Sequence, residues 1–333
     1  MSALRLSRHA LYSGLLLLIA TSARASEYGT TLYVHCGTGS GLNSIGAALK
    51  ALQHSEGTGP ATINVSGACH ENVLIQNTDR LTIAGSHGAS LTDASGDTAD
   101  VVDIRNSNVT ITGMTIDGLS GVNQDAVDCE QGSHCTLLGN TIRGEADPVG
   151  VYTLSSALIV GGVLQNGTAT GIFAFGDVTA AGVLIQGNPV GVVVNFGGRA
   201  RMVGLDPASF PGFAKAQTTI ENNFAGVRVI QAQFACAGCV IHGNGGDGIN
   251  GDVSAEVRIS PFYPHDGSSV APSVTANTGH GVYLGDLTSG SFSGPPSTVS
   301  GNGQPDIECN SATAVTRGAL VAAGGAVHTN CKD

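Results

Sequence analysis

The chain lacks the short motifs by which several large enzyme classes are recognised. Its 333 residues contain no phosphate-binding glycine loop, no nucleophile elbow around a serine and no paired-histidine zinc motif. These absences argue against a P-loop nucleotidase, an α/β-hydrolase and a zinc peptidase. Tryptophan is absent, and charged residues make up only 12% of the chain. After the first two dozen residues, no segment stays apolar for long enough to span a bilayer, which argues against membrane insertion.

Glycine is abundant instead, with 49 residues, and Val, Ile, Thr, Asn and Ser are frequent. Such a composition favours turns and short strands over long helices. The net charge of −11 argues against nucleic acid as a partner, because phosphate backbones are themselves anionic. An acidic glycan stays open as a partner, since a local basic strip or a bound cation can offset the overall charge.

The N-terminus has the pattern of a secretory signal peptide. Arg5 and Arg8 precede an apolar run over 11–20, and small residues follow at Ala23 and Ala25. We therefore expect residues 1–25 to be removed. The mature chain then begins at Ser26 with a net charge of −14, and the protein is secreted or periplasmic.

The eight cysteines of an exported chain predict four disulfides. Their positions favour pairing between nearest neighbours: Cys36 with Cys69, Cys129 with Cys135, Cys236 with Cys239, and Cys309 with Cys331. Zinc is the alternative for Cys236 and Cys239, but no second pair of ligands lies nearby in the sequence.

A repeat of roughly 22 residues runs through most of the chain. Gly-Val or Gly-Ile dipeptides mark it at Gly150, Gly171, Gly191, Gly226, Gly248 and Gly281. Asparagines in the preceding turns can hydrogen-bond along a common axis, and they are Asn140, Asn166, Asn188, Asn223, Asn244, Asn277 and Asn302. One repeat cannot bury its own apolar face, but stacked repeats can. The sequence therefore predicts an all-β fold, a single-stranded right-handed parallel β-helix.

Each coil is expected to contain three short strands, such as 151–153, 157–160 and 163–165. Because side chains alternate along a strand, Val151 and Thr153 are predicted to point inward, and Tyr152 and Leu154 outward. The open ends of the stack need caps. Residues 26–61 are predicted to form an N-terminal strand and a capping helix over 43–52. The coils then span 62–310, and 311–333 form a C-terminal cap closed by the last disulfide.

Residues 62–310 resemble the pectin-lyase-like right-handed β-helix superfamily. The resemblance rests on the repeat and on the opening Ile63-Asn64-Val65, Gly67, Glu71 and Leu81-Thr82-Ile83. It implies a site in the style of the pectate lyases, in which calcium-binding acids and a proton-abstracting Arg or Lys lie on the outer face of the first strand sheet.

Two triplets, Asn77-Thr78-Asp79 and Gly279-His280-Gly281, resemble signatures of the polygalacturonases in this superfamily. About nine coils separate them, and the paired aspartate of those enzymes is missing. We therefore interpret His280 as an ordinary turn residue.

The alternation of side chains assigns two outward columns to the first sheet. The first column is predicted to hold Asp103, Asp128, Tyr152, Phe173, Val193, Arg228, Asn250, Tyr283 and Glu308. The second is predicted to hold Arg105, Glu130, Leu154, Phe175, Asn195, Ile230, Asp252, Gly285 and Asn310.

Asp103 and Asp128 are adjacent like charges in this arrangement. Such a pair either shares a proton or holds a cation, for which calcium is the candidate. Glu130 lies beside Arg105, which is able to neutralise it. A solvated acidic patch without a function is the open alternative.

The predicted substrate-binding residues are Tyr152, Phe173, Phe175, Asn250 and Tyr283. Exposed aromatic side chains in a row suggest a binding surface on which sugar rings stack. A loop that covers them is the alternative. Two loops, 205–216 and 260–273, follow the second strand of their coils, and the sequence does not place them on a face.

We therefore expect an exported monomer that binds a polysaccharide along this outer face and cleaves or epimerises it. The candidate catalytic residues are Asp128, Glu130, Arg228 and Asp252, although Arg228 lies four coils away from the acids. The rival hypothesis is a non-enzymatic structural module of the cell envelope, because a disulfide-linked ladder of low charge has the same features without an active site.

Overall fold

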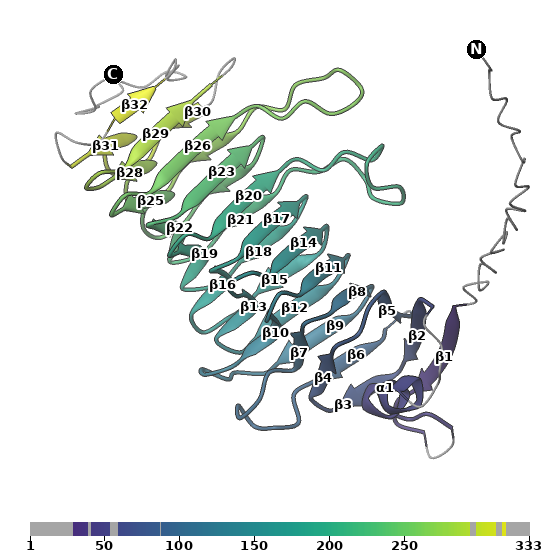
Figure 1. The fold of residues 1–333 in the computed structure, drawn as a ribbon. Coiled ribbons are helices and arrows are strands. Elements are labelled where there is room, and N and C mark those ends of the chain that lie inside the picture. Colours follow the sequence, from purple (N-terminus) through teal and green to yellow (C-terminus); the bar gives the residue numbers. More distant parts are fainter. Residues whose placement is uncertain are drawn as a thin grey trace, which may run out of the picture.

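The computed structural model describes residues 29–38, 41–53, 59–86, 88–293 and 298–310, and the backbone of 315–317. The predicted signal peptide and Cys331 lie outside these ranges. Within them the chain winds into coils that stack along one axis and form three parallel sheets (Figure 1). The predicted parallel β-helix is confirmed.

Sheet A is formed by the second strand of each coil and extends to the N-terminal strand. In spatial order it contains β1 (Thr30–His35), β2 (Ala61–Ser66), β5 (Leu81–Gly85), β8 (Asn108–Thr112), β11 (His134–Leu138), β14 (Ser156–Val160), β17 (Asp177–Ala181), β20 (Arg199–Val203), β23 (Gln233–Ala237), β26 (Glu256–Ser260), β29 (Ser289–Phe292) and β32 (Val315–Arg317).

Sheet B is formed by the third strand of each coil. It contains β3 (Ala68–His70), β6 (Ser90–Thr92), β9 (Thr115–Gly118), β12 (Thr141–Gly144), β15 (Val163–Gln165), β18 (Leu184–Gln186), β21 (Thr219–Glu221), β24 (Val240–His242), β27 (Ser273–Thr275) and β30 (Thr298–Ser300).

Sheet C is formed by the first strand of each coil. It contains β4 (Val73–Gln76), β7 (Val102–Arg105), β10 (Asp125–Glu130), β13 (Asp147–Val151), β16 (Thr170–Ala174), β19 (Val190–Asn195), β22 (Ala225–Ile230), β25 (Ile249–Asp252), β28 (Val282–Leu284) and β31 (Ile307–Cys309).

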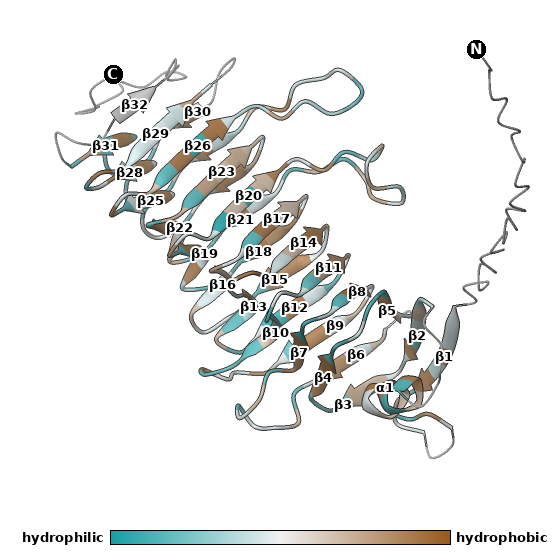
Figure 2. Cartoon of the chain, in the orientation of Figure 1, coloured by the Kyte–Doolittle hydropathy of each residue, from teal (hydrophilic) through white to brown (hydrophobic). Residues whose placement is uncertain are grey.

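Alternating residues build the core between the sheets, and Figure 2 shows hydrophobic and hydrophilic residues following one another along the strands. In sheet C, inward side chains of successive strands stack in register, and each is at most 1% exposed: Ile104, Cys129, Val151, Ala174, Val194 and Val229. Each coil thus buries its apolar side chains against the coils above and below.

The N-terminal end is covered by the capping helix α1 (Ile45–Gln53), as predicted. Ser44 Oγ accepts a hydrogen bond from the Ala47 amide at 3.1 Å, which is a typical N-cap contact. The Glu71 carboxylate accepts bonds from the Ile45 and Gly46 amides at 2.6 and 3.0 Å. A negative charge at a helix N-terminus is favourable, so the first coil holds the cap in place.

Three predicted disulfides are confirmed: Cys36–Cys69, Cys129–Cys135 and Cys236–Cys239. The zinc alternative for Cys236 and Cys239 is therefore wrong. Cys309 is also disulfide-bonded, and its predicted partner Cys331 lies outside the described residues. Within those residues, no helix combines the length and apolarity that a membrane span requires.

The predicted register is wrong in one coil. The first strand there is β13, which ends at Val151, and Val149 pairs with Ile172. Both Val149 and Val151 are fully buried, whereas Thr153 and Leu154 are exposed. The repeat pattern aligns Gly150 with Gly171. In the structure Gly150 pairs with Phe173 instead, because the turn before β16 is two residues longer than the pattern assumes. Gly150 therefore occupies the column position assigned to Tyr152, and Tyr152 the position assigned to Leu154.

The two long loops lie at sheet A, and neither of them covers sheet C. They run side by side beyond β20 and β26 (Figure 1). Phe210 and Phe213 of the first loop pack on a cluster of outward residues of sheet A that includes Val160 and Ala181. Lys215 Nζ reaches across to Asp266 at 3.0 Å and ties the first loop to the second.

Candidate functional site on the outer face of sheet C

The acidic end of sheet C has the predicted register. Asp128 on β10 pairs with Asp103 on β7, and Glu130 pairs with Arg105. Arg105 forms ion pairs with Asp103 at 2.6 Å and with Glu130 at 2.7 Å. The predicted neutralisation of Glu130 by Arg105 is therefore present, and the same guanidinium also neutralises Asp103.

A third carboxylate joins the predicted pair. Asp100, in the turn before β7, brings a carboxylate oxygen within 4.8 Å of those of Asp103 and Asp128. Asp128 is 7% exposed, and its Oδ1 has no hydrogen-bond partner among the described residues. A buried carboxylate oxygen without a partner is costly to the fold unless it carries a proton or contacts a cation. We call Asp100, Asp103 and Asp128 the aspartate triad.

Protonation relieves this repulsion when no cation is bound. Burial raises the pKa of Asp128 to about 9, and the negative charge of Asp125 adds to the shift. Burial also raises the pKa of Asp100, with Asp103 contributing. Hard divalent cations such as calcium bind through oxygen atoms, and the triad offers carboxylate oxygens from three residues toward such a site.

A second acidic pair lies beside the triad at the start of the neighbouring strands. Asp125 and Asp147 are in register on β10 and β13. Burial, followed by the charge of Asp147, raises the pKa of Asp125 to about 8, and protonated Asp125 donates a hydrogen bond to Asp147. Asp147 Oδ1 also accepts bonds from the Thr170 amide and hydroxyl at 2.8 and 2.6 Å. Asp125 therefore carries its proton at neutral pH, and burial raises the pKa of Asp147 as well.

Tyr152 connects this pair to the aromatic side chains. Its hydroxyl donates a hydrogen bond to Asp125 Oδ2 at 3.0 Å. Burial, then the charge of Asp125, raises the pKa of Tyr152, so the phenol stays protonated. A Cβ atom at Gly150 would lie 1.9 Å from Asp125 Oδ2 and 2.9 Å from the Tyr152 ring. Glycine at this column position is thus what admits both side chains.

Four aromatic rings continue the face toward the C-terminus. The Tyr152 ring lies 6.1 Å from both Phe173 and Phe175, and Phe173 and Phe175 lie 4.7 Å apart. Phe196 stacks on Phe175 at 5.7 Å and is 65% exposed. Phe196 was not predicted, because it lies in the turn after β19, outside the alternation of the strand. We call these four side chains the aromatic strip.

The polar residues predicted near the C-terminal end form a separate group. Arg228, Asn250 and Tyr283 lie in register in one row, whereas Asp252 pairs with Ile230 in the next row. Four strand spacings, roughly 19 Å, separate Arg228 from Asp128, so the structure does not bring the predicted catalytic residues together.

Two further residues join this group and were not predicted. Asp247 Oδ2 accepts a hydrogen bond from Asn250 at 2.9 Å, and its Oδ1 contacts His280 Nδ1 at 2.9 Å. The His280 ring lies 5.3 Å from that of Tyr283. Asp247 lies in the turn before β25, as Asp100 lies in the turn before β7. The alternation of side chains along a strand therefore does not reveal either residue.

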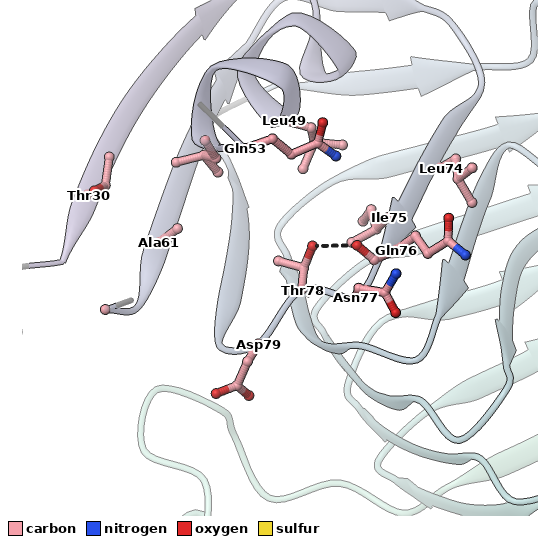
Figure 3. A pocket seen from close by; sticks show the side chains of 12 residues that line it. Thr30, Leu49, Gln53, Ala61, Leu74, Ile75, Gln76, Asn77, Thr78 and Asp79 are labelled. Carbon is pink, nitrogen blue, oxygen red and sulfur yellow. Dashed lines mark hydrogen bonds between the residues drawn. The ribbon is translucent and has the colours of Figure 1, made fainter. Parts of the chain in front are cut away.

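The first polygalacturonase-like triplet lies at the opposite end of the molecule. Asn77, Thr78 and Asp79 line a pocket of about 330 Å³ between α1 and the end of β4 (Figure 3). Thr78 Oγ1 donates to the Gln76 carbonyl at 3.1 Å, and Asp79 pairs with Arg80. The triplet thus has local structural contacts and none with His280.

Comparison of the sequence with protein-family models and with curated proteins finds no match. Membership of the pectin-lyase-like superfamily therefore stays a prediction. Among solved structures, the chain is similar to the A-module of the mannuronan C-5 epimerase AlgE6 from Azotobacter vinelandii. The two share 11% identity over 86% of this chain and 91% of that one, with a TM-score of 0.42. A likeness of this level does not transfer an activity.

Proposed function

We propose that the outer face of sheet C binds a uronate-containing polysaccharide, and that a cation held by the aspartate triad is required for binding. The observation that carries the proposal is the buried Asp128 Oδ1, which has no partner among the described residues, within this triad and next to aromatic rings that neither long loop covers. A bound divalent cation supplies positive charge that an anionic sugar would otherwise not find on this face.

The aromatic strip then provides the apolar contact. Tyr152, Phe173 and Phe175 are each half-buried and held by one another, so little side-chain entropy remains to be lost when a ring stacks on them. Arg228, Asn250 and Tyr283 extend the same face. From β7 to β28 the face is roughly 34 Å long, which suits an extended chain of several sugars.

We further propose that the bound polysaccharide is chemically modified at this face. A cation that neutralises a uronate carboxylate also acidifies the adjoining C–H bond, which is what elimination and epimerisation both require. Asp128, which is ionised when the cation is bound, and Glu130 beside it on β10 are the proposed groups that exchange a proton with a sugar at the triad. Arg228 and Asp252 are too distant to act on the same sugar ring, so their proposed role is with another residue of the bound chain.

We also propose that the protein is exported and acts as a monomer. Three disulfides support an oxidising compartment, because such bonds are rare in the reducing cytosol.

The test measures binding of a uronate oligosaccharide to the mature protein with calcium and with chelator. Calcium is expected to raise the thermal midpoint and to add a calcium-dependent component of binding, and Asp128→Asn to remove both effects. Asp79→Asn, at an exposed aspartate outside the triad and the aromatic strip, is the matched control and should behave as wild type. If calcium has no effect on wild type, or if Asp128→Asn keeps it, the proposal is wrong.

The pH dependence of calcium binding provides a second measurement. Because the pKa of Asp128 is about 9 without a cation, calcium has to displace a proton from it. The apparent affinity is therefore expected to rise between about pH 6 and about pH 9 in wild type. Asp128→Asn should flatten this profile, and a flat profile in wild type would contradict the assignment.

The same incubations separate the reactions. Unsaturated product absorbance identifies a lyase, new reducing ends without it identify a hydrolase, and a changed uronate stereochemistry identifies an epimerase. Binding without any product supports a non-catalytic glycan-binding protein. The absence of both binding and product supports the structural module of the cell envelope.

A further inference from the structure

Sheet A carries a second surface with a different chemistry. A shallow trough of about 310 Å³ lies on its outer face across β20, β23 and β26. Its floor is made by the small side chains of Ala235 and Ala237 on β23. Long side chains of the neighbouring strands form its two sides, Arg201 on β20 and Arg258 on β26. Both arginines are paired in register with Ala235.

Two arginines of the trough, Arg199 and Arg201, differ from most other basic residues that the structure describes. Arg105, Arg143 and Lys215 are engaged in ion pairs. Arg199 and Arg201 are exposed and have no ion pair among the described residues. An unpaired guanidinium presents a planar fork of donors that matches a carboxylate or sulfate group.

The negative charge within the trough is already engaged. Arg258 holds the Glu256 carboxylate through Nε at 2.7 Å and through Nη2 at 2.5 Å. Glu256 therefore does not compete for Arg199 or Arg201, which lie on the opposite wall. In a chain with a net charge of −11, this wall is a local basic strip.

We propose that this trough binds an acidic oligosaccharide and does so without a cation. Arg201 and Arg258 are two strand spacings apart, roughly 10 Å, which admits a single extended chain. The trough has no exposed aromatic ring, since Phe234 is 1% exposed, so nucleic-acid bases have nothing to stack on. An acidic oligosaccharide has carboxylate groups for the arginines and needs no aromatic surface, so it fits both the width and the lining of the trough. The site is independent of the aspartate triad.

The test uses a labelled oligogalacturonate at low salt with chelator present, so that cation-dependent binding on sheet C does not contribute. The double variant Arg199→Gln/Arg201→Gln is expected to weaken binding at least about tenfold, because two charge-assisted contacts are lost. Both side chains are exposed, so the thermal midpoint should not change. Affinity should also fall with added salt.

The matched control is Arg80→Gln/Arg143→Gln, which removes the same charge from two exposed ion pairs elsewhere. It should keep wild-type affinity, as should Asp128→Asn. The methyl-esterified oligosaccharide, which has the same sugars without charge, should not bind.

Three outcomes would overturn the proposal: no binding to wild type, equal loss in the control, or equal binding of a single-stranded oligonucleotide that the trough variant abolishes. A loss of calcium-dependent binding alone would overturn only the proposed function of sheet C.

Discussion

Glu145 shows how strongly the acidic end of the molecule depends on protonation. The residue is fully buried, and neither carboxylate oxygen has a hydrogen-bond partner among the described residues. Gly118 and Gly121 provide the space for its side chain. The carboxyl faces Asp97, whose Oδ1 accepts bonds from the Val122 and Asn123 amides at 3.0 Å each. A proton on Glu145 removes the repulsion between these two carboxylates.

Burial, followed by the charges of Asp93 and Asp97, raises the pKa of Glu145 to about 8. An acid whose pKa is higher in the folded state stabilises the fold fully below its unfolded value of 4.5 and loses that contribution as the pH rises through 8. We predict that the wild-type thermal midpoint falls over this range. Asp125 and Asp128 contribute with the same sign.

Glu145→Gln keeps the shape of the side chain and removes its ionisation. The variant is expected to recover on the order of a few kcal/mol of stability at about pH 9 relative to wild type, and little at about pH 5. Thermal midpoints measured across this range provide the check. Glu256→Gln, on the outer face of sheet A, should follow the wild-type slope. Parallel profiles for Glu145→Gln and wild type would contradict the prediction.

At the scale of the element, a ladder of buried asparagines fixes one turn of successive coils. The backbone amide and Nδ2 of each asparagine donate to Oδ1 of the next, at 2.9 to 3.2 Å from Asn188 through Asn223, Asn244 and Asn277 to Asn302. Asp306 receives the last pair. Backbone groups that a tight turn leaves unpaired are thereby satisfied.

Asn244→Ala interrupts this ladder in its middle. The amide and Nδ2 of Asn223 then lose their common acceptor, and Asn277 Oδ1 loses its side-chain donor while keeping the backbone amide of residue 244. Because these atoms stay buried, a loss of about 2–4 kcal/mol is expected. Denaturant or thermal unfolding followed by circular dichroism measures it. Asn166→Gly in an exposed turn outside the ladder should be near neutral, and an equal effect of both changes would contradict the role of the ladder.

The strands were predictable from sequence, and the turns were not. Alternation placed Asp103 beside Asp128 and Arg105 beside Glu130, because two-residue periodicity leaves a strand only one way to bury its apolar side chains. Turn length has no such constraint, so the predicted register of the coil that contains Tyr152 differs from the observed register by two residues. Asp100, Phe196 and Asp247 were missed for the same reason, since each lies in a turn. Asn166 was included in the ladder, although its turn exposes it.

At the scale of the whole molecule, the three-sheet architecture separates opposite chemistries. The acidic and aromatic residues lie on sheet C, and the arginine trough lies on sheet A. Along the axis, the coil of β10 and the coil of β20 are three spacings apart, roughly 14 Å. The triad and the trough share no residue. At this separation, with the rigid coils between them, the effects of substitutions in the two sites should be independent.

This independence can be measured with a tetrasaccharide too short to reach both sites. Its binding to wild type should resolve into a calcium-dependent component that Asp128→Asn removes and a salt-sensitive component that Arg199→Gln/Arg201→Gln removes. The combined triple variant should lose both, with free-energy changes that add to within about 0.5 kcal/mol. A larger coupling would mean that one ligand contacts both surfaces. For a long polymer such bridging is the expected behaviour, because the second contact becomes intramolecular. The triple variant should therefore lose far more affinity for the polymer than the tetrasaccharide data imply.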